Sequence, residues 1–333
     1  MQIVALLRHS LFGGPMPVTL PSDGEGWQRL FDESRRQAVT ALVYDALLAL
    51  PKELRPPHGI LFHFTSMVST IADDNRRREQ ALRRFAALVE QRLSLPACVV
   101  KGSALAALYP EPLHRECGDN DLYTGTDTAR IVALMRDSGI AVDEKDPRHA
   151  SFTLDGVSFE CHNYLLYHND DIDWHFTDAD GYKVLVLEEE AFFLAKHMEH
   201  HAVFFHNPVR LRSLADWAML LRADGFDLSR LRAIKADSDV AVFAELLTKA
   251  CNDLFALQLP CDEQLFVRKG LSTADFVALY MLCPERSPSA TVRVVRRSWK
   301  YLRYHRQYKA IYGQSMFGRF YLKNVWQAIK QKI

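Results

Sequence analysis

Residues 97–123 read ACVVKGSALAALYPEPLHRECGDNDLY, and they combine a glycine turn with two closely spaced aspartates. The stretch opens with an apolar run at residues 97–100, which is typical of a short buried strand. Lys-Gly-Ser at residues 101–103 interrupts this run. The pattern therefore predicts a strand that ends in a glycine turn.

A short helix is expected after this turn. Ser103 can cap a helix over residues 104–108, where alanine and leucine favour helix, and Pro110 and Pro112 close it. A strand, a glycine turn and a helix N-terminus together present free backbone N–H groups and a positive dipole to an anion. Because the Lys101 ammonium adds a point charge, the turn is a candidate phosphate-binding site.

Asp119 and Asp121 follow in the sequence Gly-Asp-Asn-Asp-Leu-Tyr of residues 118–123. In a strand, residues i and i+2 point to the same face, so the two carboxylates would project together. They would repel each other unless a cation lay between them, and hard oxygen ligands suit magnesium bound with substrate phosphates. The alternative is a solvated turn, because Gly, Asp and Asn are turn formers. A calcium loop of the EF-hand type does not fit, since Gly125 is displaced by one position and Arg130 replaces the final glutamate.

The segment VVKGSALAALYPEPLHRECGDNDLY resembles the core of the nucleotidyltransferase superfamily that includes DNA polymerase beta. It is most similar to a poorly characterised bacterial branch that reads Lys-Gly, an apolar helix, Tyr-Pro, Arg and Asp-apolar-Asp. The likeness continues to RLRSLADWAMLL, where the branch tends to carry Arg-Leu and then Leu-x-Asp. Asn120 departs from the branch, whose aspartates are usually separated by an apolar residue, and Tyr123 replaces a common aliphatic. The matching positions are Lys101, Gly102, Ser103, Tyr109, Pro110, Arg115, Asp119 and Asp121.

The resemblance implies an α+β fold, with a small mixed nucleotidyltransferase-type β-sheet, flanking helices, and helical regions at both ends of the chain. It also implies a third carboxylate on a later strand beside the Asp-x-Asp strand. A β-hairpin fits that place, since residues 150–154 and 157–161 flank the turn signal Asp155-Gly156. Its second arm puts Glu160 and His162 on one face, so Glu160 is the candidate; an exposed strand glutamate is the alternative.

The implied activity is transfer of a nucleoside monophosphate from a nucleoside triphosphate to an acceptor hydroxyl, with two Mg²⁺ ions, or Mn²⁺ in their place. In this interpretation Asp119, Asp121 and Glu160 are the catalytic and metal-binding residues. Lys101, Gly102, Ser103 and Arg115 would bind the nucleotide. The acceptor is left open among a small molecule, a protein and RNA. The alternative, which Asn120 favours, is a non-catalytic relative that binds nucleotide or nucleic acid.

Histidines gather in the segment that follows. Residues 187–223 predict two helices separated around Asn207-Pro208, and His197 and His201 lie four residues apart on the first, with His200 and His206 nearby. Neither H-E-x-x-H nor H-x-x-E-H is present. We expect these histidines to line an interface between a helical domain and the core, and a zinc site is the alternative.

Composition sets the broad class. The chain has 333 residues, 48% of them hydrophobic and 25% charged, which is ordinary for a soluble globular protein of about two domains. Its six cysteines form no C-x-x-C pair, so neither a zinc ribbon nor a redox motif is indicated. The N-terminal apolar run contains Arg8 and His9 and is too short for a signal sequence or a membrane span. We therefore expect a cytoplasmic protein without a transmembrane segment.

The sequence predicts four segments. Residues 1–95 form a helical region, with one helix from Ser22 or Asp23 to Pro51 and another over residues 60–95. Residues 96–185 form the nucleotidyltransferase core, residues 186–285 a helical domain, and residues 286–333 basic aromatic helices. Further helices are expected from Thr126 or Asp127 to about Gly139, and at about residues 228–235, 240–257 and 273–282.

The C-terminal segment has an unusual charge. Residues 286–333 contain twelve Lys or Arg and no Asp or Glu, so residues 1–285 carry a formal −12 in a chain of net charge zero. Aromatic residues are interleaved among the basic ones, a pattern that suits nucleic acid or an anionic membrane surface. The alternative, which we favour, is that this segment packs its aromatic side chains onto the acidic body and leaves its basic face in water.

Overall fold

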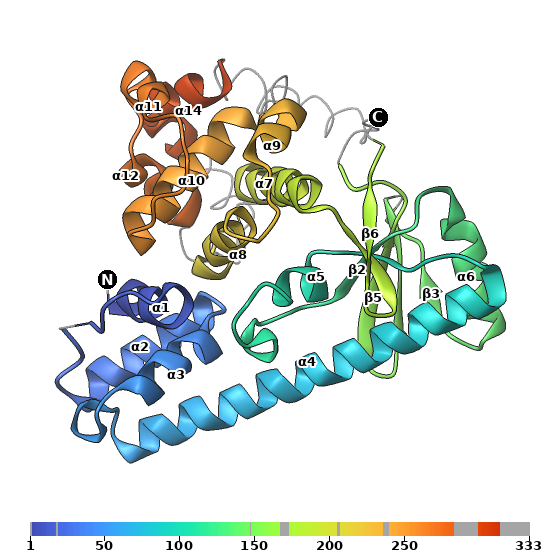
Figure 1. Cartoon of the computed structure of the whole chain (residues 1–333), viewed down its shortest axis with the longest axis horizontal. Coiled ribbons are helices and arrows are strands. Elements are labelled where there is room, and N and C mark those ends of the chain that lie inside the picture. The colour runs from blue at the N-terminus through green and yellow to red at the C-terminus, as the bar shows by residue number, and fades with distance from the viewer. Residues whose placement is uncertain are drawn as a thin grey trace. The chain divides into compact units, whose positions relative to one another are not determined.

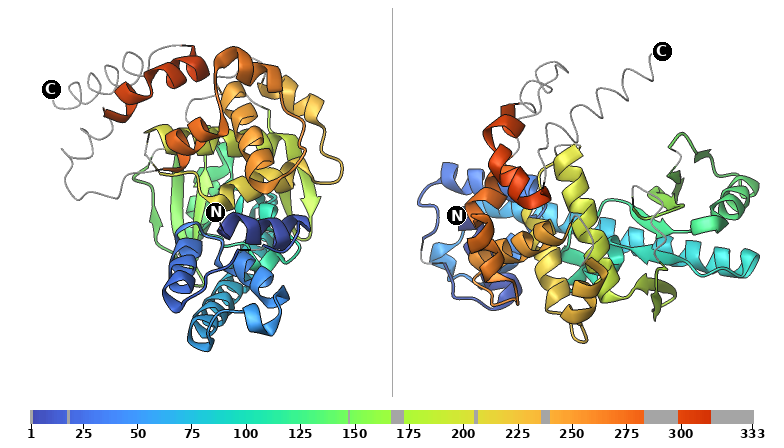
Figure 2. Two further views of the ribbon diagram at one scale, coloured as in Figure 1. Left: turned by 90° about the vertical axis from the view of Figure 1, so that its left-hand side faces the viewer. Right: turned by 90° about the horizontal axis from the view of Figure 1, so that it is seen from above.

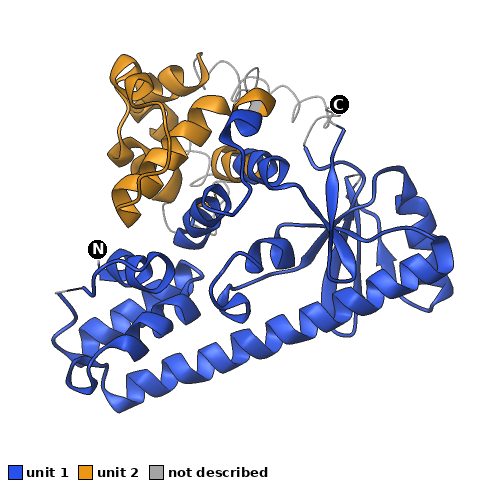
Figure 3. Ribbon diagram, in the orientation of Figure 1, with its two compact units in different colours: residues 1–196, 210–231 blue, residues 197–209, 232–333 orange. Residues whose placement is uncertain are grey.

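The structure of the protein is a computed structural model that describes residues 2–17, 19–146, 148–166, 173–204, 207–235, 240–282 and 299–313. The chain forms two compact units, coloured separately in Figure 3. Unit 1 comprises residues 1–196 and 210–231, and unit 2 comprises residues 197–209 and 232–333. Within the described part of the chain, no helix combines the length and the apolar character that crossing a bilayer requires. The division into four segments stays a prediction.

Three helices open unit 1: α1 (Gln2–Phe12), α2 (Gly24–Arg36) and α3 (Thr40–Ala49). Asp23 caps α2 as expected, because its Oδ1 accepts a hydrogen bond from the Gly26 N–H at 2.6 Å. The single helix predicted from there to Pro51 is wrong, however. The helix is interrupted between α2 and α3. Ala38 adopts a left-handed backbone conformation there, with φ of 54°, and so cannot continue a right-handed helix.

The long helix α4 (His58–Leu93) confirms the second predicted helix and links the first three helices to the sheet (Figure 1). Its charged run at residues 73–78 is largely solvent-facing, as expected for a helix surface. Asn75 is the exception. Its buried amide donates hydrogen bonds to the carbonyls of Leu113 at 2.7 Å and Arg115 at 2.9 Å. The middle of α4 thereby holds the loop that precedes the aspartates.

A seven-stranded mixed sheet forms the centre of unit 1, in the order β3-β4-β5-β2-β1-β7-β6, and Figure 2 shows it from two further sides. The predicted hairpin is confirmed. Asp155 and Gly156 form its turn with φ of 53° and 76°, as a tight hairpin requires. The hairpin joins β2 through a parallel β5, and β1 pairs with β2 antiparallel and with β7 parallel. The strands are β1 (Cys98–Val100), β2 (Asn120–Tyr123), β3 (Val142–Asp143), β4 (His149–Leu154), β5 (Val157–His162), β6 (Phe176–Ala179) and β7 (Tyr182–Leu185).

The hydrophobic core lies between one face of this sheet and two helices, α4 and α6 (Thr128–Asp137). Phe85 of α4 packs against Phe152 and Phe159 of the hairpin, with ring centroids 5.8 and 5.2 Å away. The β2·β5 register pairs Asn120 with Phe159, so Asn120 lies on this covered face and is 2% exposed. The mixed sheet with flanking helices confirms the predicted α+β class.

After β7, the elements in the described part of the chain are helical. Helices α7 (Leu187–Phe204) and α8 (Leu211–Leu221) confirm the predicted pair around Asn207-Pro208. Helices in the described residues that follow include α9 (Leu228–Lys235), α10 (Ala241–Phe255), α11 (Glu263–Lys269), α12 (Thr273–Phe276) with a following π-helical turn (Val277–Met281), and α14 (His305–Tyr312).

Most of the basic C-terminal segment lies outside the described residues. Within residues 299–313, Tyr301, Tyr308 and Tyr312 are buried, whereas the Trp299 side chain is 67% exposed. Most aromatic side chains in this part of the segment are therefore buried, and the packing of the segment onto the acidic body stays a prediction.

Candidate active site

The glycine turn begins at the end of β1, where the chain passes directly into the five-residue helix α5 (Gly102–Ala106). The helix starts one residue before the predicted cap, so Ser103 lies in its first turn and Lys101 takes the capping position without a side-chain hydrogen bond. Lys101 has φ of 56° and ψ of −133°, a conformation that costs a non-glycine residue about 1–3 kcal/mol. Its backbone N–H donates to the Glu190 Oε1 of α7 at 2.9 Å, which holds the turn in place.

Asp121 is the most enclosed of the predicted acids, with 6% of its surface exposed. The Lys101 Nζ lies 2.9 Å from its Oδ2, and the His162 Nε2 lies 2.9 Å from its Oδ1. Burial by itself would raise the pKa of Asp121, but Lys101 and His162 outweigh it and hold that pKa well below its usual range. Asp121 is therefore an ionised carboxylate with a cation on one side and an imidazole on the other.

Glu160 joins the two aspartates, as predicted from the resemblance. The parallel register of β2 and β5 places Asp121 beside Glu160, and Asp119 precedes β2. One carboxylate oxygen from each of the three residues lies within 4.8 Å of the others, which is close enough to share a divalent cation. Burial raises the pKa of Glu160, and the nearby charges of Asp119 and Asp121 raise it further. The donor set consists of oxygen atoms and fits Mg²⁺ or Mn²⁺.

Arg115 lies behind the turn, where its side chain is 4% exposed. Its guanidinium makes two parallel hydrogen bonds to Asp216 of α8, from Nε at 2.7 Å and from Nη2 at 2.9 Å. Nη1 also donates to the Gly102 carbonyl at 3.1 Å, and the Tyr109 hydroxyl donates to Asp216 at 2.7 Å. Three predicted motif residues thus form one buried network that supports the turn, and nucleotide binding by Arg115 stays a prediction.

Two residues of the site were not predicted. Glu190 is 2% exposed, and among the described residues its Oε2 has no hydrogen-bond partner. Burial raises the pKa of Glu190 to about 7. Glu190 lies one helical turn before Phe193 and Leu194, on the apolar side of α7. This position is the feature of the sequence that could have indicated a buried glutamate. His149 is the other residue, and it was overlooked because the hairpin was expected to begin one residue later.

The histidines of α7 do not take part in this cluster. The rings of His197 and His201 lie 4.1 Å apart. Among the described residues, the groups of three or more side chains that could hold a metal ion centre on Glu160 and include neither histidine. The predicted interface role of these histidines stays a prediction.

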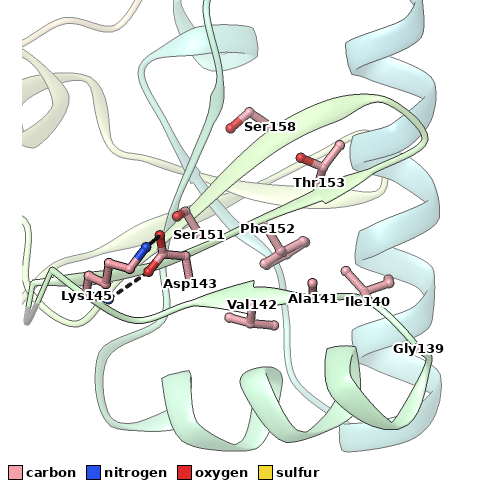
Figure 4. Close-up of a pocket in the computed structure, with 10 residues that line it drawn as sticks. All are labelled: Gly139, Ile140, Ala141, Val142, Asp143, Lys145, Ser151, Phe152, Thr153 and Ser158. Atoms are coloured by element: carbon pink, nitrogen blue, oxygen red, sulfur yellow. Dashed lines mark hydrogen bonds and ion pairs between the residues drawn. The ribbon is translucent and has the colours of Figure 1, made fainter.

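A pocket of about 710 Å³ lies next to the cluster, on strands β3, β4 and β5 (Figure 4). Among the described residues, those that line this pocket do not include Asp119, Asp121 or Glu160. Ser151 connects the two places, because it lines the pocket and pairs with Glu160 across the hairpin. The remaining lining residues are Gly139, Ile140, Ala141, Val142, Asp143, Lys145, Phe152, Thr153 and Ser158.

Comparison with known families agrees with this geometry. A family model described as "uncharacterised nucleotidyltransferase" matches residues 23–256, which is more than half of the chain. The chain belongs to this nucleotidyltransferase family. Membership indicates a transferase with a nucleotide substrate, and the match spans the turn, the three acids and Asp216. No curated protein and no solved structure matches the chain significantly.

Proposed function

We propose that this nucleotidyltransferase transfers a nucleoside monophosphate from a nucleoside triphosphate to an acceptor hydroxyl. The acceptor oxygen bonds to the α-phosphorus, the bond from that phosphorus to the bridging oxygen breaks, and pyrophosphate leaves. The observation that carries the proposal is the convergence of Asp119, Asp121 and Glu160 beside the Lys-Gly turn. These carboxylates come from two separate parts of the chain, and one oxygen of each lies within 4.8 Å of the others.

The three carboxylates would hold Mg²⁺ ions, or Mn²⁺ in their place. Such ions, when bound, polarise the phosphoryl group and stabilise the attacking and leaving oxygens. Glu160 is the acid best suited to accept the proton of the acceptor hydroxyl, because burial and its acidic neighbours raise its pKa. Asp121, with its lowered pKa, stays ionised throughout the pH range in which Glu160 titrates.

The nucleotide would lie over the turn. The Ser103 hydroxyl and the backbone N–H groups of the turn would bind the phosphates, and Lys101 connects this turn to the carboxylates through its ion pair with Asp121. The Lys101 ammonium can exchange its bond to Asp121 for a phosphate oxygen, which would neutralise part of the triphosphate charge. Arg115 would act by holding the Gly102 carbonyl, so that the turn keeps its shape.

The first test is the substitution Asp121→Asn. Purified protein is incubated with labelled nucleoside triphosphates and Mg²⁺ against pools of RNA, protein and small metabolites. Asp121→Asn is expected to lower transfer by at least about a hundredfold, the loss that follows removal of a key electrostatic group. Asp127→Asn, at a surface ion pair with Arg130, is the matched control and is expected to keep full activity. Full activity of a folded Asp121→Asn protein would contradict the metal assignment.

The second candidate is a non-catalytic nucleotide-binding protein. The observation that favours it is that Lys101 and His162 each contact one oxygen of Asp121, so that a cation competes with them for this carboxylate. The melting temperature, measured with and without nucleotide and Mg²⁺, shows whether the protein has a nucleotide site at all, as both functions require. A rise in melting temperature that is absent in Asp119→Ala indicates a working site. Such a rise without labelling of any pool would favour the binding function.

A further inference from the structure

A second group of potential metal ligands lies beside the three carboxylates and is built differently. The β4·β5 register places His149 directly opposite His162, and Glu160 lies two residues before His162 on the same face. One ligand atom from each of the three side chains lies within 4.8 Å of the others. All three side chains are less than one-third exposed, at 17%, 29% and 16% for His149, Glu160 and His162.

The distances from the two imidazoles to Glu160 are longer than hydrogen bonds and approach the spacing of two ligands on one ion. The Nε2 of His149 lies 3.7 Å from one oxygen of Glu160, and the Nε2 of His162 lies 3.6 Å from the other. Hydrogen bonds from nitrogen to oxygen are shorter, at about 2.7–3.2 Å. Two ligands at about 2.0–2.1 Å from a tetrahedral metal ion are separated by about 3.3 Å. Both imidazoles thus approach Glu160 at nearly the spacing of a common ion.

The ligand types select the class of ion. Imidazole nitrogen with carboxylate oxygen suits Zn²⁺, Co²⁺, Mn²⁺ and Fe²⁺, whereas Mg²⁺ prefers oxygen ligands alone. Asp119, Asp121 and Glu160 with the Lys101 ammonium carry a formal charge of −2 when both imidazoles are neutral. One dication therefore neutralises the cluster without a nucleotide. A second dication would add uncompensated charge until a triphosphate arrived.

The geometry points to a transition-metal site formed by His149, Glu160 and His162, next to the oxygen site and sharing Glu160 with it. An ion in this site takes the Nε2 of His162, so the hydrogen bond from His162 to Asp121 at 2.9 Å gives way. Loading this site therefore frees one oxygen of Asp121. The inference concerns binding alone and holds whether or not the protein transfers nucleotides.

The test is a titration of the full chain, without affinity tag or nucleotide, with Co²⁺, whose visible absorption reports nitrogen ligation. We expect one Co²⁺ per chain and an affinity at least about tenfold above that for Mg²⁺. His149→Ala and the milder His149→Gln are expected to weaken Co²⁺ binding by at least about tenfold, while binding of Mg²⁺ to the carboxylates is unchanged. His149 is the residue to change because its imidazole lies beside Glu160 and His162, whereas His162 also bonds to Asp121.

Two controls keep the result specific. His58→Ala removes an exposed histidine at the start of α4, and His197→Ala alters the histidine pair of α7. Both variants are expected to bind Co²⁺ as the unaltered protein does. Wild-type Co²⁺ affinity in folded His149→Ala or His149→Gln would overturn the assignment, as would loss of binding in His197→Ala instead.

Discussion

Glu190 and Lys101 form an unusual pair of residues behind the site. Lys101 adopts a backbone conformation that glycine adopts more easily, and its N–H is held by a buried carboxyl group on another element. A charged carboxylate in this place costs free energy, because its second oxygen has no hydrogen-bond partner among the described residues. Protonation removes that cost while Oε1 continues to accept the hydrogen bond from Lys101.

This situation predicts a pH-dependent stability that Glu190→Gln abolishes. The pKa of Glu190 rises from 4.5 to about 7 on folding, so the folded chain binds more protons between these values. Stability therefore falls as the pH rises from about 4.5 to about 7, by about 3 kcal/mol from this residue. Glu190→Gln is expected to stabilise the protein at pH 8 and to change it little at pH 5, as measured by urea unfolding.

The matched control for this experiment is Glu90→Gln, at an exposed glutamate of α4. It is expected to leave the unfolding free energy unchanged at both pH values. Equal stability of Glu190→Gln and the unaltered protein at pH 8 would show that Glu190 carries no such cost.

The limits of sequence reasoning are clear at this scale. Asp119 and Asp121 are two positions apart in the sequence, and Glu160 follows from the family pattern, so the structure brings together residues that the sequence named. Glu190 lies 89 positions from Lys101, and its role depends on where α7 crosses the turn. No periodicity or spacing encodes that crossing, because it results from the packing of a helix on a sheet.

At the scale of elements, one hairpin was predicted and another was missed. Both turns carry the Asp-Gly signal, at Asp155-Gly156 and at Asp180-Gly181, and Gly181 has a positive φ of 87°. The first hairpin has alternating apolar residues that pack on α4. The second hairpin consists of β6 and β7, and β6 reads FTDA and forms an edge of the sheet. An edge strand with one partner needs little apolar pattern, so its sequence signal is weak.

The network of Arg115 and Asp216 is expected to be the strongest link between α8 and the glycine turn. Asp216→Ala leaves the guanidinium of Arg115 buried and without its charge partner, which typically costs about 3–5 kcal/mol. Chemical unfolding measures this loss. The control Asp127→Ala removes an exposed ion pair with Arg130 and is expected to cost about 0–1 kcal/mol. Similar losses in the two variants would contradict the structural role of the network.

At the scale of the whole molecule, charge is divided unevenly, because residues 286–333 contain twelve Lys or Arg and no Asp or Glu. In α14, Tyr308 is 2% exposed, while Arg306 and Lys309 face solvent. The aromatic and basic residues of this helix therefore have separate roles. The aromatic side chains contribute to the packing of unit 2, and the basic side chains give its surface a positive charge.

Two variants separate these roles. Tyr308→Ala is expected to destabilise the protein by about 3–5 kcal/mol, the usual cost of removing a large buried aromatic side chain. Arg306→Gln with Lys309→Gln is expected to change stability by less than about 0.5 kcal/mol for each residue. Thermal and urea unfolding provide both values. A larger loss from the double basic variant would mean that these cations, and not the tyrosine, hold α14.

The long helix α4 has a consequence for how this protein can evolve. Asn75 bonds to the loop before the aspartates, while Phe85 packs under the hairpin that carries Glu160. One residue inserted between them would rotate one contact by about 100° relative to the other, so both could not be kept. The number of residues between Asn75 and Phe85 is thus fixed by the need to keep both side chains at their angles around the helix axis. Insertions within this part of the helix would separate the two halves of the carboxylate cluster.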